Sequence, residues 1–422
     1  MIPPTITPPR LLTPMATSLG DHLQRYGVLP PLSAAAILSE VDASGLLGRG
    51  GAGFPTGRKL RAVATGTGPA VVVGNGCEGE PASAKDVLLL ERSPHLVLDG
   101  LQVAATAVGA DQVHLVVHQA SPALRFAERA IADRRKVGLD RLPVQLHGIP
   151  GRYVSSEESA LVHFLNGGPA KPLFTPPRPY ERGVDKRPTL INNVETLAHL
   201  GLVARHGAAW FRGIGDPEGP GTQLLSVAGP GATQRVLEVE TGLTVDDVLA
   251  MAGVDADACQ AVLVGGYFGT WLSTSVARPL RLTHSAVRAA GGALGAGIVV
   301  GLPRDRCGLV ETSRVATYLA AHNAGQCGPC LNGLPSIAAA LHKLAHGPWR
   351  EELGVALHRW LTVVPGRGAC RHPDGAVRLV GSALQVFAAD VARHRQGLPC
   401  AARTAPAWLP VPDSSAAQAP WR

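Results

Sequence analysis

Apolar positions recur at helical spacing near the start of the chain and then give way to short apolar runs. Helices are predicted over residues 31–41 and 58–65, separated by the glycine-rich loop GLLGRGGAGFPTG. The runs PAVVVGNG and VHLVVH are typical of buried strands, and residues 96–108 between them have helical spacing. A strand, a helix and a second strand in this order predict a parallel α/β sheet.

A different pattern begins near Gly221. The runs TQLLSVAG and RVLEVETG flank a turn and predict a hairpin, Thr244 is the expected N-cap of a helix, and AVLVGGY predicts another strand. This ββαβ order predicts a small β-grasp domain of the SLBB-like kind. Helical spacing follows in four segments, over residues 311–322, 334–346, 351–364 and 376–395.

These patterns predict three domains between two irregular ends. We expect a Rossmann-like α/β domain over residues 21–218, a β-grasp domain over 219–300 and a helical bundle over 301–398. The proline-rich residues 1–20 lack the basic start and apolar core of a secretion signal, and they are expected to be a disordered leader. The tail over residues 399–422 is also expected to be disordered.

Composition narrows the class of protein. The 422 residues are 45% apolar and 17% charged, as in globular proteins with several cores. The net charge of +7 comes without a dense Lys/Arg run, so we expect no nucleic-acid partner, and a basic face for an acidic protein fits as well. The longest uncharged apolar stretch, residues 289–303, is too short to cross a bilayer. Seven cysteines without a secretion signal favour the reducing cytoplasm over a disulfide framework.

The loop GRGGAGFPTG has the G-x-G-x-x-G arrangement of phosphate-binding loops, in Gly48, Gly50 and Gly53. Glycines at this spacing let backbone N–H groups approach a phosphate closely. The usual dinucleotide fingerprint follows a strand, whereas this loop follows a helix. A phosphate site and an ordinary glycine-rich turn therefore both remain open.

Three pairs of polar side chains follow predicted elements. Glu78 and Glu80 follow a predicted buried strand, and ligands bind at the carboxyl ends of strands in open α/β sheets. Carboxylates there could accept hydrogen bonds from ribityl or ribose hydroxyls, and paired amides suit the edge of a flavin ring; solvated loop acids and helix caps are the alternatives. The pairs are Glu78 and Glu80, Glu157 and Glu158, and Asn192 and Asn193.

Two cysteines stand close together in HNAGQCGPCLNG, between the first two C-terminal helices. The spacing of Cys327 and Cys330 suits an iron–sulfur cluster, a thioredoxin-like redox pair or half of a zinc site. Cys370 lies 40 residues after Cys330 within the helical region and favours the cluster. Three other cysteines are expected to be ordinary thiols, namely Cys77, Cys259 and Cys400.

In this order the motifs resemble the NADH-oxidising flavoprotein subunit of respiratory complex I, a module shared with NAD-linked hydrogenases and formate dehydrogenases. The resemblance covers roughly residues 35–390. It implies an FMN-binding α/β domain, a β-grasp domain and a helical domain with a [4Fe–4S] cluster. Hydride from NAD(P)H would enter FMN, and single electrons would leave through the cluster to a ferredoxin-like or other electron-transfer protein. The alternatives are a partner-fed subunit that does not use NADH and a degenerate subunit that acts as a binding or assembly module.

The resemblance assigns roles where residues match. Glu80 and Glu158 would position the nicotinamide, and Gly51 and Phe54 would also contact the nucleotide. The FMN contacts would be Gly48, Arg49, Gly50, Lys59, Asn75, Glu78, Gly79, Tyr153, Glu157, Asn192, Asn193 and Thr196. The cluster ligands would be Cys327, Cys330 and Cys370.

Four positions depart from the family pattern. They are Cys77 in place of an acidic residue, Thr175 in place of a lysine, Ala62 in place of a second aromatic residue and Ala324 in place of the first cluster cysteine. Loss of the cation and of the stacking face would each weaken nucleotide binding by about 1 to 2 kcal/mol, so FMN binding is better supported than NADH binding. The fourth iron would need another ligand, with His372 favoured over His322 and Cys307.

Overall fold

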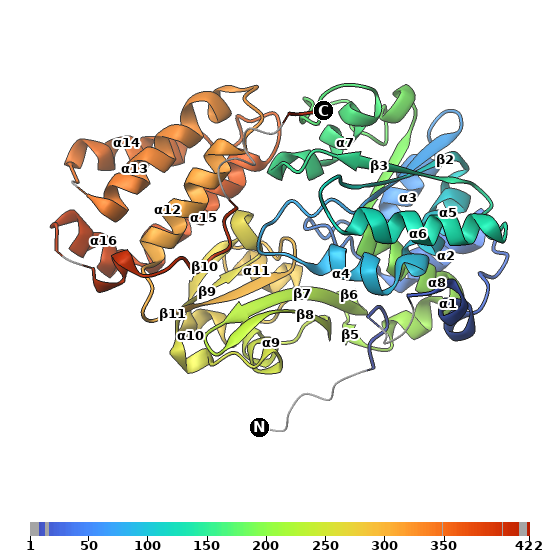
Figure 1. The fold of residues 1–422 in the computed structure, drawn as a ribbon, viewed down its shortest axis with the longest axis horizontal. Helices are drawn as coiled ribbons and strands as arrows, with labels where there is room; N and C mark the ends of the chain where they lie inside the picture. Colours follow the sequence, from blue (N-terminus) through green and yellow to red (C-terminus); the bar gives the residue numbers. More distant parts are fainter. Residues whose placement is uncertain (1–7, 13–16, 348, 399, 413–419) are drawn as a thin grey trace.

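The computed structural model describes residues 8–12, 17–347, 349–398, 400–412 and 420–422. Figure 1 shows three parts that follow one another along the chain: an α/β part in blue to green, a second sheet in yellow, and a group of helices in orange to red. The predicted fold class is confirmed, because a parallel sheet, a further sheet and C-terminal helices occur in the expected order.

The first sheet has four parallel strands in the order β3-β2-β1-β4. The strands are β1 (Ala70–Asn75), β2 (Ala110–His118), β3 (Val144–Ile149) and β4 (Thr189–Asn193). The chain builds outward from β1 to β3 and then returns to place β4 on the other side of β1. This reversal creates a topological switch point between β1 and β4, where open α/β sheets bind ligands beyond the carboxyl ends of the strands.

Eight helices of the described residues belong to this first part. They are α1 (Leu19–Tyr26), α2 (Ala34–Ser44), α3 (Thr56–Ala64), α4 (Lys85–Arg92), α5 (Pro94–Val108), α6 (Ala123–Lys136), α7 (Glu158–Leu165) and α8 (Val194–Arg212). Helix α5 is almost entirely buried and packs against α8. A side chain at Gly100 would meet the Leu197 carbonyl oxygen at 1.8 Å, so only glycine permits this close approach. Buried Asp99 ties neighbouring helices together through His22, Arg134 and Arg205.

The second sheet has five strands in the order β10-β9-β11-β7-β8. Its strands are β7 (Thr222–Gly229), β8 (Ala232–Glu240), β9 (Cys259–Val264), β10 (Thr270–Ser273) and β11 (Ile298–Pro303). The helices of this part are α9 (Val245–Ala252), α10 (Thr274–Ala277) and α11 (His284–Ala289). The two short strands β5 (Gly215–Asp216) and β6 (Gly219–Pro220) precede β7 in the chain. The hairpin β7–β8 and the helix α9 are as predicted, and Thr244 caps α9 by accepting a hydrogen bond from the Asp247 N–H. Strand β11 lies parallel to β7 in the centre of the sheet, which is a β-grasp arrangement.

The C-terminal part contains five α-helices. They are α12 (Gly308–Ala321), α13 (Leu334–His346), α14 (Glu351–Val363), α15 (His372–Val386) and α16 (Ala388–Arg395). The expectation of one continuous helix over residues 376–395 is wrong, because α15 and α16 meet at 82°. The buried ring of Phe387 at this bend packs 5.4 Å from that of Trp271. Within the described ranges no single helix is long and apolar enough to span a membrane, although the bent pair α15–α16 passes that test when the two helices are combined.

The C-terminal tail packs on the body of the protein. The Trp408 indole donates to the Gly301 carbonyl oxygen at 3.0 Å, and the Leu409 N–H donates to Glu311 at 2.8 Å. The chain ends beside α7, where the Ala170 N–H donates to the Trp421 carbonyl oxygen (Figure 1). Predicted disorder is therefore wrong for these residues, because their apolar side chains bury surface; residues 399 and 413–419 lie outside the described ranges.

The described part of the predicted leader, residues 8–12, also packs on the body of the protein. Leu11 is fully buried, and its N–H donates to Glu238 on β8 at 2.8 Å. Residues 8–12 are thus held against the body, contrary to the prediction, while residues 1–7 and 13–16 lie outside the described ranges.

Candidate functional site

The glycine-rich loop between α2 and α3 lies against the carboxyl end of β4. The Arg49 N–H donates to the Thr196 hydroxyl at 2.8 Å, and the Gly48 N–H donates to the Phe54 carbonyl oxygen at 2.9 Å. A Cβ atom at Gly50 would lie 3.2 Å from the Cβ of Asn193. The loop is therefore packed directly on the switch point of the first sheet, where a phosphate-bearing ligand is expected.

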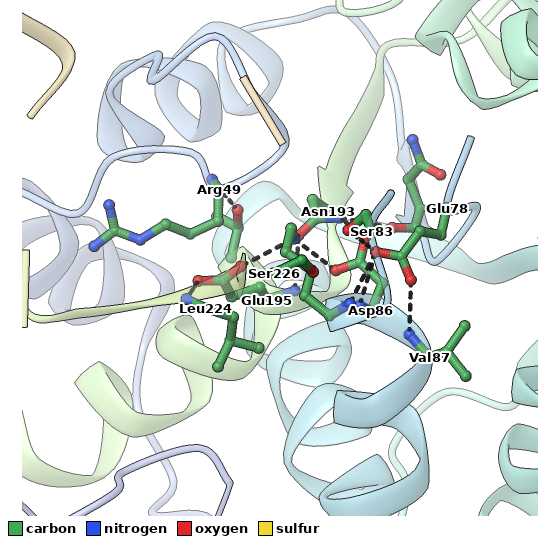
Figure 2. Close-up of polar contacts among 12 residues, drawn as sticks. Arg49, Glu78, Ser83, Asp86, Val87, Asn193, Glu195, Leu224 and Ser226 are labelled. Carbon is green, nitrogen blue, oxygen red and sulfur yellow. Dashed lines mark hydrogen bonds and ion pairs between the residues drawn. The ribbon is translucent and has the colours of Figure 1, made fainter. Parts of the chain in front are cut away.

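The end of β1 forms the other wall of this switch point. Asn75 donates to the Ser156 carbonyl oxygen at 2.9 Å. Glu78 precedes α4 by seven residues, and its carboxylate reaches the start of that helix, where it accepts from the backbone N–H groups of Lys85 at 3.0 Å and Asp86 at 3.3 Å. Burial raises the pKa of Glu78 to about 7, against the lowering effect of Lys85 and of these hydrogen bonds. Figure 2 shows that its carboxylate faces α4, so Glu78 fixes this helix beside the crevice.

Lys85 is the centre of a buried polar network, and its partners Asp86, Asn193 and Glu195 are labelled in Figure 2. Its ammonium nitrogen lies 2.7 Å from Asp86, 2.9 Å from Glu195 and 3.3 Å from the side-chain oxygen of Asn193. Burial lowers the pKa of Lys85, but Asp86, Glu195 and Glu78 outweigh burial and hold it above its usual value. Asp86 also accepts from the Asn193 amide at 2.7 Å. Lys85 was not assigned to the site from the sequence, although it follows Glu80 by five residues.

A narrow pocket lies between the glycine-rich loop and the second sheet. Its lining comes from both parts of the chain: Gly48, Arg49, Lys85, Glu195, Gln223, Leu224, His284, Leu294, Gly295 and Gly297. Arg49 is buried, its Nη2 donates to the Pro220 carbonyl oxygen at 3.0 Å, and its Nε has no partner among the described residues. A buried guanidinium with a spare donor suits a phosphate. Gln223 and His284 were missed because no local motif marks residues that only the fold brings here.

The residues assigned to the nucleotide are more exposed. Phe54 is 49% exposed, with the Arg58 guanidinium 5.6 Å from the centre of its ring. Lys59 forms an ion pair with Glu158, whose side chain is 45% exposed. These positions leave an aromatic face and a carboxylate accessible to a ligand from solvent. Ala62, on α3, offers no second ring.

Glu80 has different surroundings from Glu158. Its carboxylate accepts hydrogen bonds from the Tyr153 hydroxyl and from the Tyr267 N–H, the latter at 3.1 Å. Burial raises the pKa of Glu80 to about 7, although both hydrogen bonds lower it. The Tyr153 ring packs 5.5 Å from that of His372 on α15. Glu80 thus joins the first part of the chain to the second sheet and, through Tyr153, to the helices.

The other assigned residues shape the same crevice. Glu157 caps α7 by accepting from the Ser159 N–H at 2.9 Å and the Ala160 N–H at 3.3 Å. Gly79 packs under the 3₁₀ turn η1 (Tyr153–Ser156), and a Cβ there would lie 2.7 Å from the Tyr153 carbonyl oxygen. The side-chain nitrogen of Asn192 is buried without a hydrogen-bond partner in the part of the chain that the structure describes. A ligand atom or an ordered water would satisfy such a donor.

The three cysteines assigned to the cluster lie near one another, but their sulfur atoms do not all lie within 4.8 Å of one another. Cys327 precedes and Cys330 lies within a π-helical turn, η5 (Pro329–Gly333), and Cys370 precedes α15. Burial, together with the nearby Cys327 thiol, raises the pKa of Cys330 to about 11. Burial likewise raises the pKa of Cys370 to about 12, to which Glu157 and both other thiols contribute. The three thiols thus form one group close to the start of α7, and a group of thiols suits a metal cluster.

Comparison with known proteins agrees with both groups of residues. A family model described as the Nuo51 FMN-binding domain matches residues 41–201, and the NADH-ubiquinone oxidoreductase-F iron-sulfur binding region matches residues 311–394. The F 2 subunit of the NADH-quinone oxidoreductase of Rhizobium meliloti is 31% identical over 378 residues, which cover 86% of this chain and 90% of that protein. The chain belongs to the family of NADH-quinone oxidoreductase F subunits.

A further member and a solved structure extend this result. The F subunit of the Salmonella typhimurium enzyme is 32% identical over 378 residues, covering 85% of this chain and 84% of that protein. The structure of an air-oxidised NAD+-reducing [NiFe]-hydrogenase matches with a TM-score of 0.79 and 30% identity, over 91% of this chain. The match spans only 65% of the hydrogenase chain.

This member of the family has an alanine at one expected cluster position, and the structure excludes one of the three expected replacement ligands. Cys307 is ruled out, because it lies at the opposite end of α12 from the cysteine motif, beside His394. The Nε2 of His372 donates to the Leu319 carbonyl oxygen at 2.8 Å, which leaves its buried Nδ1 without a partner among the described residues and able to bind a metal. His322 is 2% exposed, and neither of its ring nitrogens has a partner among the described residues.

Proposed function

We propose that this chain oxidises NAD(P)H and passes the electrons through FMN and a [4Fe–4S] cluster to a protein partner. The observation that carries the proposal is that one chain holds both the crevice at the switch point and the three-cysteine group, which meet at the start of α7. Glu157 caps α7 and lies near enough to Cys370 to raise its pKa. When bound, FMN would convert a two-electron hydride donor into a source of single electrons.

The polypeptide would hold and orient the cofactor. The backbone of the loop around Gly50 and the spare Nε donor of Arg49 would bind the FMN phosphate. The unpaired amide of Asn192 would donate to a polar atom of the flavin. Lys85 and Asp86 would act by holding Asn193 in place rather than by touching the substrate.

The nucleotide would enter from the exposed side of α3. Phe54 would stack on a ring of the nucleotide, and Glu158 would accept hydrogen bonds from its hydroxyl or amide groups. Glu80 would serve a different role from the one assigned by resemblance. Its two hydrogen bonds inside the protein make it a positioning residue for Tyr153 and the second sheet.

Cys327, Cys330 and Cys370 would bind three irons of the cluster, and His372 or His322 would bind the fourth. The Asn323 side chain donates to the Cys330 carbonyl oxygen at 3.1 Å, which keeps the segment that carries His322 next to the cysteines. Histidine ligation in place of cysteine is known to raise the potential of iron–sulfur centres.

A partner-fed electron-transfer subunit is the second candidate. Thr175 and Ala62 favour it, because a cation and an aromatic face that the resemblance leads one to expect are missing. In either case the acceptor would be another electron-transfer protein, in a reducing compartment such as the cytoplasm. The two candidates share the cofactors and differ only in the donor.

Anaerobic purification followed by flavin, iron and sulfide analysis tests the cofactors, and stopped-flow addition of NADH or NADPH tests the donor. Bleaching of the flavin absorbance by either nucleotide is expected. The variant Cys370→Ala should keep its flavin and its bleaching by NADH but lose cluster reduction, because Cys370 lies outside the flavin crevice. Flavin without bleaching supports the partner-fed reaction, and protein that binds neither FMN nor iron contradicts both candidates.

A further inference from the structure

Three side chains at the far end of α12 form a second group of metal-binding type. Cys307 immediately precedes α12, His394 lies in the last turn of α16, and Cys400 follows that helix by a few residues. One ligand atom of each lies within 4.8 Å of the other two. The Sγ of Cys307 is 3.7 Å from the Nε2 of His394. The cluster cysteines lie at the other end of α12, so the two groups are separate.

The histidine of this group is already oriented for a metal. Its Nδ1 lies 3.1 Å from the Leu344 carbonyl oxygen, which can only accept a hydrogen bond. The proton therefore sits on Nδ1, and the lone pair of Nε2 faces Cys307. Metal-binding histidines typically use this arrangement, in which a backbone carbonyl fixes the ring and its tautomer.

The surroundings of Cys307 and Cys400 suit the binding of a soft or borderline metal ion better than a role as reactive nucleophiles. Cys307 is 2% exposed and His394 is 7% exposed, whereas Cys400 is partly exposed and offers a route for an ion to enter. Burial, together with the neighbouring Cys400, raises the pKa of Cys307 to about 12. A buried thiol of this kind is inert as a nucleophile, and a divalent cation would have to displace its proton.

We propose that Cys307, His394 and Cys400 bind a Zn²⁺ ion, with water in the fourth position. Two thiolates and one imidazole are ligands that tetrahedral Zn²⁺ accepts. The ion would join three segments, namely the β11–α12 junction, the end of α16 and the tail that leads to Trp408 and Leu409. It would have a structural role and take no part in electron transfer. Cys307 and Cys400 also lie outside residues 311–394, the region that the iron-sulfur family model matches.

The test is zinc analysis of the full-length holoprotein after expression with added zinc and dialysis against a weak chelator. About one zinc per chain is expected, with an X-ray absorption spectrum at the zinc edge that shows sulfur at about 2.3 Å and nitrogen or oxygen at about 2.0–2.1 Å. The edge is specific to zinc, so the iron of the cluster does not interfere.

Cys400→Ser is the diagnostic variant, because this residue is partly exposed and lies in the tail. It should retain less than about a tenth of the zinc, since a hydroxyl replaces a thiolate ligand. Its flavin content should not change, which separates this proposal from the proposed function. Cys259→Ser is the matched control, because the Cys259 thiol instead contacts the Asp255 carbonyl oxygen at 3.5 Å, and it should keep its zinc.

Three outcomes would overturn the proposal. They are wild-type protein without zinc, a Cys400→Ser variant that keeps the full amount, and a Cys307–Cys400 disulfide detected by peptide mapping of zinc-supplemented protein that was alkylated before digestion.

Discussion

Asn75 and Asn193 face each other at the carboxyl ends of the parallel strands β1 and β4, and the Asn193 amide lies 3.4 Å from the Asn75 carbonyl oxygen. This pairing defines the crevice of the first sheet. Gly50 packs on the same Asn193, so the glycine-rich loop and the strand ends form one site although they are far apart in sequence.

We expect Gly50→Val to abolish FMN binding. A Cβ at this position already comes within 3.2 Å of Asn193, and the added methyl groups would push the loop away from the strand ends. Flavin content, measured by absorbance after extraction, should fall to less than about a tenth of that of the wild type. Gly151→Val is the control, because nothing lies within 4 Å of a Cβ there. Full flavin in Gly50→Val would contradict this placement.

Thr175→Lys should strengthen the use of NADH. The substitution restores a cation where the family pattern has a lysine, and one charge-assisted hydrogen bond to phosphate is worth roughly 1.5 kcal/mol. The apparent KM for NADH should fall by up to about tenfold, with kcat little changed, in steady-state assays with an artificial acceptor. Thr175→Gln provides a control of similar length without charge. An equal effect of both substitutions would argue against the electrostatic explanation.

Ala324→Cys should give the cluster a fourth thiolate. Ala324 is buried, and its backbone N–H lies close enough to the Cys330 sulfur to lower the pKa of that thiol. An added anionic ligand should lower the reduction potential and slow the loss of the cluster in air. Redox titration followed by electron paramagnetic resonance measures the first effect, and iron content after exposure to air measures the second. An unchanged potential would show that the new thiol does not reach the cluster.

The stability of the protein should depend on the ionisation of Glu80. Its pKa rises from 4.5 to about 7 on folding, so the folded state holds this proton more tightly than the unfolded state. The wild type should therefore lose up to about 3 kcal/mol of unfolding free energy, relative to Glu80→Gln, as pH rises from about 4.5 to 7. Urea unfolding at several pH values, followed by circular dichroism, measures the difference.

Tyr153→Phe provides a second check on Glu80. The Tyr153 hydroxyl donates to the Glu80 carboxylate and lowers the pKa of Glu80. Removal of this hydroxyl should therefore extend to higher pH the range over which the protein loses unfolding free energy. A difference between wild type and Glu80→Gln that does not change with pH would contradict the assignment.

Local sequence patterns predicted much of the secondary structure and many of the site residues of this protein. Short apolar runs marked β1 and β2 of the first sheet but not β3 or β4, and helical spacing marked most of the C-terminal helices, because burial on one face or both imposes a period on the sequence. The residues around Gly50, Asn75, Asn193 and Cys330 were identified from short motifs, because their chemistry requires particular residue types at fixed spacing.

Only the tertiary structure decided which of these residues share a site. The order of the strands brings Asn75 opposite Asn193, and no local signal in the sequence specifies that order. The second sheet supplies His284 to the pocket beside Arg49, and the end of α16 brings His394 to Cys307. Contacts between residues so distant along the chain depend on how whole elements pack, because the packing of buried surfaces, rather than the spacing of residues, determines them.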